Sequence, residues 1–196
     1  MLPSYEYFAT NLRESNCIFE SFKICNTHLP MSPYFSESLV PALEAAETLY
    51  TLELSNCLGQ SDLMSVVAFL SKNQVLHSLN LSGHCFDEET AISLANAIRK
   101  HPVLYAIFLD NCSLANGDTN VLNRILFATK DCDSLSLGHS SFNSDNIALL
   151  ARFIGKKIAL TSLSLNNVCV NKDNQKLLSH ALGKNKNISE LSLRNW

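Results

Sequence analysis

Apolar residues recur along the chain at a nearly fixed interval. A pattern of the form L-x-x-L-x-L begins at Leu76 and again at Leu104, Cys132 and Leu160, with apolar residues at positions 4, 6 and 11 of each unit. The same frame fits from Leu49, from Phe19 with aromatic substitutions, and from Ile188. The units therefore start at 19, 49, 76, 104, 132, 160 and 188, at intervals of 30, 27, 28, 28, 28 and 28 residues. Spacing of this length and regularity predicts stacked repeats.

Each unit is predicted to contain a strand followed by a helix. Apolar residues at positions 19 and 23 are four residues apart, which places both on one helical face. Position 19 holds Val67, Leu94, Leu122, Leu150 and Leu178, and position 23 holds Ile98, Leu126, Ile154 and Leu182, with Leu70 replacing it in the 27-residue unit. The predicted class is α/β, with a repeat domain of about seven units over residues 19–196 and an N-terminal helical cap over residues 1–18.

Lysine recurs near position 25 of the unit, at Lys72, Lys100, Lys156 and Lys184. The favoured interpretation is a positive charge at each helix C-terminus, where exposed carbonyls carry partial negative charge. The alternative is a basic stripe for an acidic partner.

A 28-residue unit with a full helix resembles the ribonuclease-inhibitor-like class of leucine-rich-repeat proteins. The segments 76–81 (LHSLNL) and 160–165 (LTSLSL) carry the resemblance, which covers residues 19–196. It implies a horseshoe-shaped solenoid, with a parallel sheet on the concave face, helices on the convex face, and binding of other proteins. Position 9 of this class usually holds Asn or Cys. Here it holds Thr27, Cys57, His84, Cys112, Ser140, Val168 and Trp196, so the polar ladder is broken at Val168 and the sequence leaves the loop geometry there open.

Strand positions 3, 5 and 7 face away from the predicted core and form the exposed sheet surface. Phe108 is the one large apolar side chain predicted to face solvent there, and buried aromatic anchors are frequent hot spots of interfaces. The alternative is that Phe108 packs between its neighbours and binds nothing. The candidate partner-binding residues on or beside this surface are Tyr50, Glu53, Asn80, Tyr105, Phe108, Asp110, Ser136, His139, Asn166 and Arg194.

Catalysis and metal binding receive little support from the sequence. Acyl transfer requires a nucleophile, a base and an orienting carboxylate. The pattern places residues of these types, Ser136, His139 and Asp110, on neighbouring strands. Serine is frequent on this face, however, and no nucleophile turn accompanies these residues. His84 and Cys85 are adjacent without a second pair at ligand spacing. The chain is therefore predicted to be neither an enzyme nor a cofactor-binding protein.

The composition of the chain limits the kinds of partner and the compartment that we expect. The chain is 46% hydrophobic and 17% charged, with a net charge of −3, so it has no basic excess for nucleic acid. Its seven cysteines are odd in number and form no Cys-x-x-Cys pair, which favours a reducing compartment. The N-terminus has no Sec-type leader, and no apolar run approaches the ~20 residues of a membrane span. We therefore expect a cytoplasmic protein with no nucleic-acid or membrane partner.

The resulting prediction is a module that binds an unidentified protein partner through its concave face. Free-standing repeats of this kind also resemble secreted effectors of intracellular bacteria, which implies secretion by a non-Sec route and action in a host cytosol. The alternative is a GTPase-activating regulator resembling the Ran-type activators of this repeat class, with candidates Asn111, His139 and Asn167 at position 8. A third possibility is a homodimer formed through the open edge strand at residues 188–193.

Overall fold

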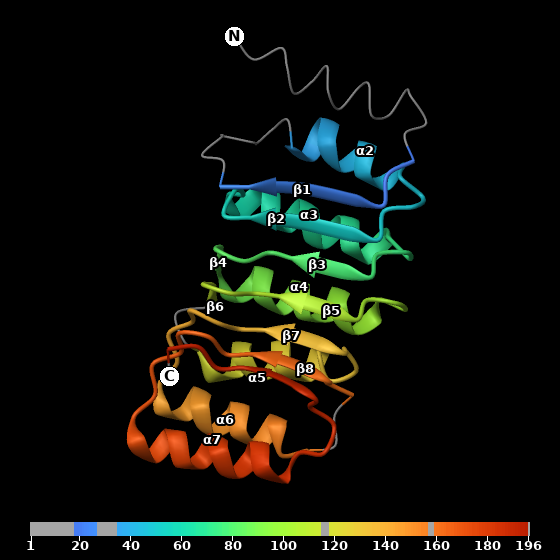
Figure 1. The fold of residues 1–196 in the computed structure, drawn as a ribbon. Coiled ribbons are helices and arrows are strands. Elements are labelled where there is room, and N and C mark those ends of the chain that lie inside the picture. Colours follow the sequence, from blue (N-terminus) through green and yellow to red (C-terminus); the bar gives the residue numbers. More distant parts are fainter. Residues whose placement is uncertain (1–17, 27–34, 115–117, 157–158, 196) are drawn as a thin grey trace.

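The computed structural model describes residues 18–26, 35–114, 118–156 and 159–195 of the 196-residue chain. Strands and helices alternate along it, which confirms the predicted α/β class (Figure 1). Seven strands form one parallel sheet in the order β1(Ser21–Cys25), β2(Thr51–Ser55), β3(Ser78–Asn80), β5(Ala106–Phe108), β7(Ser134–Ser136), β8(Ser162–Ser164) and β9(Glu190–Ser192).

An α-helix follows each of the first six strands of this sheet in the described residues. These helices are α2(Val40–Glu44), α3(Gln60–Lys72), α4(Glu88–Lys100), α5(Thr119–Ala128), α6(Ser144–Ile154) and α7(Lys172–Lys184), with a π-helix, η1(Phe35–Leu39), before α2. Two short strands, β4(Cys85–Phe86) and β6(Ser113–Leu114), pair with each other in the loops that lead to α4 and α5. The helices form a second layer behind the sheet (Figure 1).

Neighbouring strands pair in the predicted register. Position 4 of each unit aligns with position 4 of the next, so that Phe22 pairs with Leu52, Leu79 with Ile107, and Leu163 with Leu191. The pairs are offset by the 30, 27 and 28 residues that the sequence pattern contains. Apolar side chains at positions 1, 4 and 6 are buried from β2 to β8, and those at position 19 are buried throughout. The periodic apolar pattern is therefore the core.

A backbone carbonyl at position 2, just before each strand, sets the spacing of the sheet. The carbonyl of Tyr50 accepts hydrogen bonds from the amides of His77 and Ser78 at 2.8 and 3.0 Å. The carbonyls of Glu20, His77, Tyr105, Asp133 and Thr161 accept the equivalent two amides of the next unit. Because the position-2 carbonyl accepts two amides from the next unit each time, the position-2 residues form a regular column along the N-terminal ends of the strands.

The turn after each strand requires a left-handed backbone at position 8. Positive φ angles of 50–57° occur at Asn26, Asn56, Asn111, His139, Asn167 and Asn195, and Gly83 has φ 82°. Asparagine and glycine are the residues that adopt this conformation most readily, since their side chains are short and polar or missing. The backbone conformation of the turn is therefore enough to explain the asparagines at position 8, without a ligand.

His84 closes the loop at position 9 of its unit. It is 3% exposed, its Nε2 accepts the amides of Cys57 and Leu58 at 3.2 and 3.0 Å, and its Nδ1–H donates to the Leu81 carbonyl at 2.9 Å. Both ring nitrogens are therefore used by the neutral imidazole. Burial lowers the pKa of His84 from its ordinary value of 6.5.

Side-chain caps fix the helix starts. Asp87, Asp118, Asn143 and Asn171 each accept a backbone amide from the first turn of their helix. At Asn143 the bond is reciprocal, because the side chain of Asn146 also accepts the Asn143 amide. Caps of this kind supply partners for amides that the helix leaves unpaired.

Several sequence predictions fall outside the described residues. The N-terminal cap lies almost entirely in residues 1–17, and Trp196 is likewise not described. At the break in the polar ladder, Val168 is 1% exposed, and Asn167 just before it has φ 57°, close to the other asparagines at position 8.

Gly138 is expected to tolerate no side chain. An added Cβ would lie 2.9 Å from the Asn166 carbonyl oxygen and 3.0 Å from Oδ1 of Asp110. Gly138→Ala should therefore lower the free energy of unfolding by about 1–3 kcal/mol in urea titrations. The control is Gly183→Ala in α7, where an added Cβ meets nothing within 4 Å and stability should rise by up to about 1 kcal/mol. Equal effects of the two variants would contradict the crowding at Gly138.

The stability of the protein should fall as the pH drops below about 6.5. Burial holds the pKa values of His84 and His101 below 6.5 in the folded state, so the unfolded chain binds more protons in that range and protonation favours unfolding. His84→Asn keeps an acceptor for the loop but removes one titrating group. Denaturation at pH 7.5 and 5.5 should show a smaller loss for this variant than for wild type, and an unchanged loss would contradict the role of His84.

Candidate functional site

The open sheet face, formed by the side chains at strand positions 3, 5 and 7, carries most of the predicted binding residues. Phe108 lies in its middle, on β5, with Asn80 and Ser136 as its cross-strand neighbours. Phe108 is half-buried rather than fully exposed. Phe108 is therefore less exposed than the sequence pattern predicts.

Polar side chains at position 7 bond to the next strand. Oδ1 of Asp110 accepts the Ser136 hydroxyl at 2.5 Å and the Gly138 amide at 2.6 Å. Oδ1 of Asn166 accepts the equivalent groups of the next unit, the Ser192 hydroxyl at 2.8 Å and the Arg194 amide at 2.7 Å. These amides lie just beyond the three-residue strands, so the side chains replace ladder bonds that the short strands do not make.

Other predicted site residues are also occupied by internal bonds. Ser136 is 4% exposed and Asn80 accepts the amide of Ser82 at 2.9 Å. Glu53 pairs with Lys23 at 3.0 Å and lies 3.4 Å from the Cys25 thiol. Arg194, by contrast, has an exposed side chain. The polar part of the open sheet face is thus largely self-satisfied, with few free groups to offer a partner.

An aromatic edge, formed by Tyr50, His77 and Tyr105, borders the open sheet face. Tyr50 and Tyr105 are 38% and 45% exposed. The His77 ring lies between them in edge-to-face contacts, with ring centres 5.1 Å from Tyr50 and 5.5 Å from Tyr105. Nδ1–H of His77 donates to the Val75 carbonyl at 2.6 Å, which fixes the ring. Edge-to-face aromatic contacts at this distance are favourable beyond the area they bury.

The aromatic edge follows from the repeat itself. All three residues occupy position 2, whose carbonyls bond successive units together, so the rings inherit the spacing of the sheet. Both tyrosines were predicted from the sequence, whereas His77 was not. The signal was available, because the same register places His77 at position 2 of the unit between them.

The position-8 residues form a second column at the other end of the strands. The side chain of Asn167 donates to Nε2 of His139 at 2.9 Å, and Asn195 donates to Asn167 at 2.7 Å. Asn56 and Asn26 are joined in the same way at 3.3 Å. His139 is exposed, but its backbone conformation and its bond to Asn167 both serve the turn.

The structure does not assemble a catalytic triad from the predicted residues. The Ser136 hydroxyl bonds to Asp110, whereas the His139 ring bonds to Asn167. In the part of the chain that the structure describes, no three His, Cys, Asp or Glu side chains are grouped so as to hold a metal ion. Within the same residues, no helix is long and apolar enough to cross a membrane.

A cavity of about 790 Å³ opens beside the loops that follow the strands. It extends over four units and is lined by polar, apolar and thiol side chains, including Asn111, Cys112, His139, Phe142 and Asn143. No Lys, Arg, Asp or Glu is among the residues that line it. A charged ligand such as a phosphate would therefore find no counter-charge there.

Comparison with known proteins gives a likeness of fold. Neither a protein-family model nor a curated protein matches the sequence. Among solved structures, the chain is similar to the tropomodulin C-terminal domain of Caenorhabditis elegans, with a TM-score of 0.44, 14% identity and coverage of 92% of each chain.

Thiol labelling should divide the described cysteines into two groups. Burial raises the pKa values of Cys57, Cys112 and Cys132 to about 12, which suppresses the reactive thiolate. Cys25, Cys85 and Cys169 are exposed. Iodoacetamide at pH 8 followed by peptide mass spectrometry should modify the exposed group in the native protein and the buried group only in denaturant. Early labelling of Cys112 would contradict the described core.

Proposed function

We propose that the chain is a protein-binding module whose partner contacts the aromatic edge and the adjoining open sheet face. The observation that carries the proposal is the exposed array of Tyr50, His77 and Tyr105. Tyrosines provide large, rigid contact areas with a polar tip, and they are enriched among the residues that dominate interface energies. Phe108, half-buried nearby, continues the apolar surface toward the middle of the sheet.

The self-satisfied polar groups also support binding rather than catalysis. From β2 to β8 the carboxylates of this face are already paired or hydrogen-bonded, at Glu53 and Asp110, so a partner that displaces water there buries no unpaired charge. The aromatic rings are held by backbone spacing and by the His77 contact, so ordering them on binding costs little conformational entropy.

We also propose that the chain belongs to the ribonuclease-inhibitor-like class and forms a horseshoe of about seven units. In the same proposal it acts as a bacterial effector in a host cytosol. This proposal rests on the 28-residue period and on resemblance. Homodimerisation through β9 is a separate proposal, supported by the position of this strand at one end of the described sheet and by Leu191, which is 43% exposed. GTPase activation receives no support from Asn111, His139 and Asn167, whose left-handed backbones account for their residue types.

Replacement of both tyrosines tests the proposal. Tyr50→Ser/Tyr105→Ser should leave the melting temperature within a few degrees of wild type, because both side chains are well exposed. Quantitative affinity capture from host-cell lysate, with cross-linking to map contacts, should show at least about a tenfold loss of the partners that wild type enriches.

The matched control is Leu177→Ser, which removes an apolar side chain of similar exposure, 41%, from helix α7. This variant should recover the same partners as wild type. If the tyrosine variant recovers them equally well, or if cross-links map away from the open sheet face, the proposed function is wrong.

A further inference from the structure

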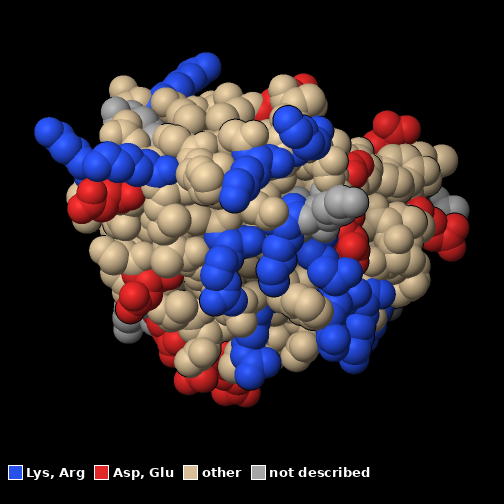
Figure 2. All heavy atoms as spheres, turned by 90° about the horizontal axis from the view of Figure 1, so that it is seen from below, with Lys and Arg blue, Asp and Glu red and all other residues tan. Residues whose placement is uncertain are grey.

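Charge is unevenly distributed along the chain. Residues 150–196 carry eight Lys or Arg and two Asp or Glu, whereas residues 1–149 carry seven and sixteen. The net charge of −3 conceals this separation. Viewed from the C-terminal end, the molecule displays many Lys and Arg side chains on one face, with acidic side chains mainly at its margins (Figure 2). Surfaces of one sign attract partners of the other.

A small groove between α5 and α6 combines basic and apolar side chains. Its volume is about 220 Å³. Leu126 and Phe127 line it from α5, and Leu149 and Phe153 line it from α6. Phe127 is 55% exposed, whereas Arg99, Gly155 and Gly183 occupy the equivalent position of other units. This exposed ring is therefore a departure from the repeat and not a product of it.

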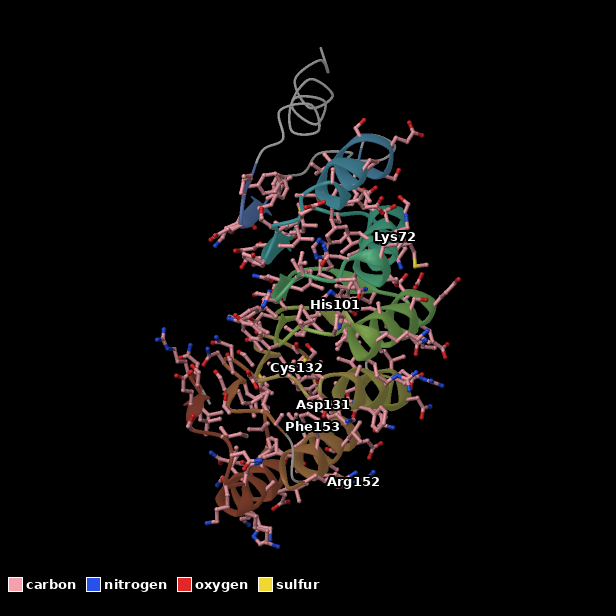
Figure 3. All side chains as sticks on the ribbon, turned by 90° about the vertical axis from the view of Figure 1, so that its right-hand side faces the viewer. Lys72, His101, Asp131, Cys132, Arg152 and Phe153 are labelled. Carbon is pink, nitrogen blue, oxygen red and sulfur yellow. The ribbon has the colours of Figure 1, made fainter. Side chains whose placement is uncertain are left out.

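Three cations border the groove: Lys130, Arg152 and Lys156. Nζ of Lys130 lies 5.9 Å from the centre of the Phe127 ring and 2.5 Å from a carboxylate oxygen of Asp131, the one acidic side chain that lines the groove. Among residues 18–26, 35–114, 118–156 and 159–195, neither Arg152 nor Lys156 forms an ion pair. Arg152 and Phe153 on α6 lie on the same side of the molecule as Asp131 (Figure 3). Two cations are thus available beside an apolar floor.

The corresponding groove between α3 and α4 lacks this combination. It is larger, about 410 Å³, and no aromatic carbocyclic ring lines it. Lys100 is its one lining Lys or Arg, and the nearby Lys72 is already paired with Glu44 at 2.9 Å. An exposed aromatic ring and unpaired cations therefore occur together at the α5–α6 groove but not at the α3–α4 groove.

We propose that the groove between α5 and α6 binds an acidic peptide segment that inserts one bulky apolar side chain beside Phe127. The groove is smaller than the roughly 300–1,000 Å³ of small-molecule sites, which favours a single side chain as its occupant. Flanking carboxylates of the segment would pair with Arg152 and Lys156, whose charges are otherwise uncompensated. The site lies on the helix layer, away from the open sheet face, and does not depend on the function proposed for that face.

Fluorescence anisotropy with the full chain tests the site. The probe is a labelled nine-residue peptide of Glu and Asp with one central Phe, and its controls carry a central Ala or replace the acidic residues by Lys. The acidic Phe peptide should bind, the Ala peptide should bind at least about fivefold more weakly, and the basic peptide should not bind. Arg152→Glu/Lys156→Glu should weaken binding about tenfold or more, and Phe127→Ser should weaken it about fivefold.

Arg124→Glu is the matched control for charge. Arg124 occupies the position of Arg152 one unit earlier and is likewise exposed, but it does not line the groove. This variant should change the affinity less than about twofold at 150 mM salt, where charges beyond about 8 Å are screened. An equal loss on Arg124→Glu would show attraction by overall charge and overturn the site.

Two other occupants are distinguishable. Co-sedimentation with phosphatidylserine vesicles that depends on Arg152 and Phe127, without peptide binding, would identify a membrane surface and overturn the proposal. Self-association in analytical ultracentrifugation that Arg152→Glu abolishes would identify the acidic half of a second copy as the occupant, which would also overturn it.

Discussion

The stacking of the units depends on the carbonyl at position 2, which accepts two amides from the following unit. This bond pair recurs from Glu20 to Thr161 and fixes both the spacing and the register of strands that are only three residues long in most units. Such short parallel strands make few ladder bonds of their own. The register in turn aligns the leucines at positions 1, 4 and 6, and their burial provides the main driving force for stacking.

The same constraint explains why so many polar residues of the sheet are not free to bind. Amides beyond the ends of short strands need partners, and the side chains of Ser82, Asp110 and Asn166 supply them. Gly138 lacks a Cβ because the Asp110 carboxylate and the Asn166 carbonyl occupy the space where it would lie. Residues that look like a binding surface in a one-dimensional pattern are in this way components of the stack.

Departures from the repeat are therefore the more informative positions for function. The column at position 2 is aromatic in three consecutive units only, and position 24 is aromatic only at Phe127. Both places put exposed rings on the surface, one at the edge of the sheet and one on the helix layer. Residues that follow the repeat pattern form the core and the turns. The two binding proposals rest on exposed aromatic side chains at positions that depart from the pattern.

The sequence by itself determined the period, the strand register, the buried columns and the alternation of strand and helix, because stacking units must repeat their core at the same positions. It also identified Tyr50 and Tyr105. Only the tertiary structure decided how far Phe108 is covered, that the side chains of Asp110 and Asn166 each bond to the following unit, and that His77 lies between the tyrosines. The reason is physical: a period specifies which residues lie on neighbouring strands, but burial and hydrogen bonding depend on the distances and ring orientations between those strands.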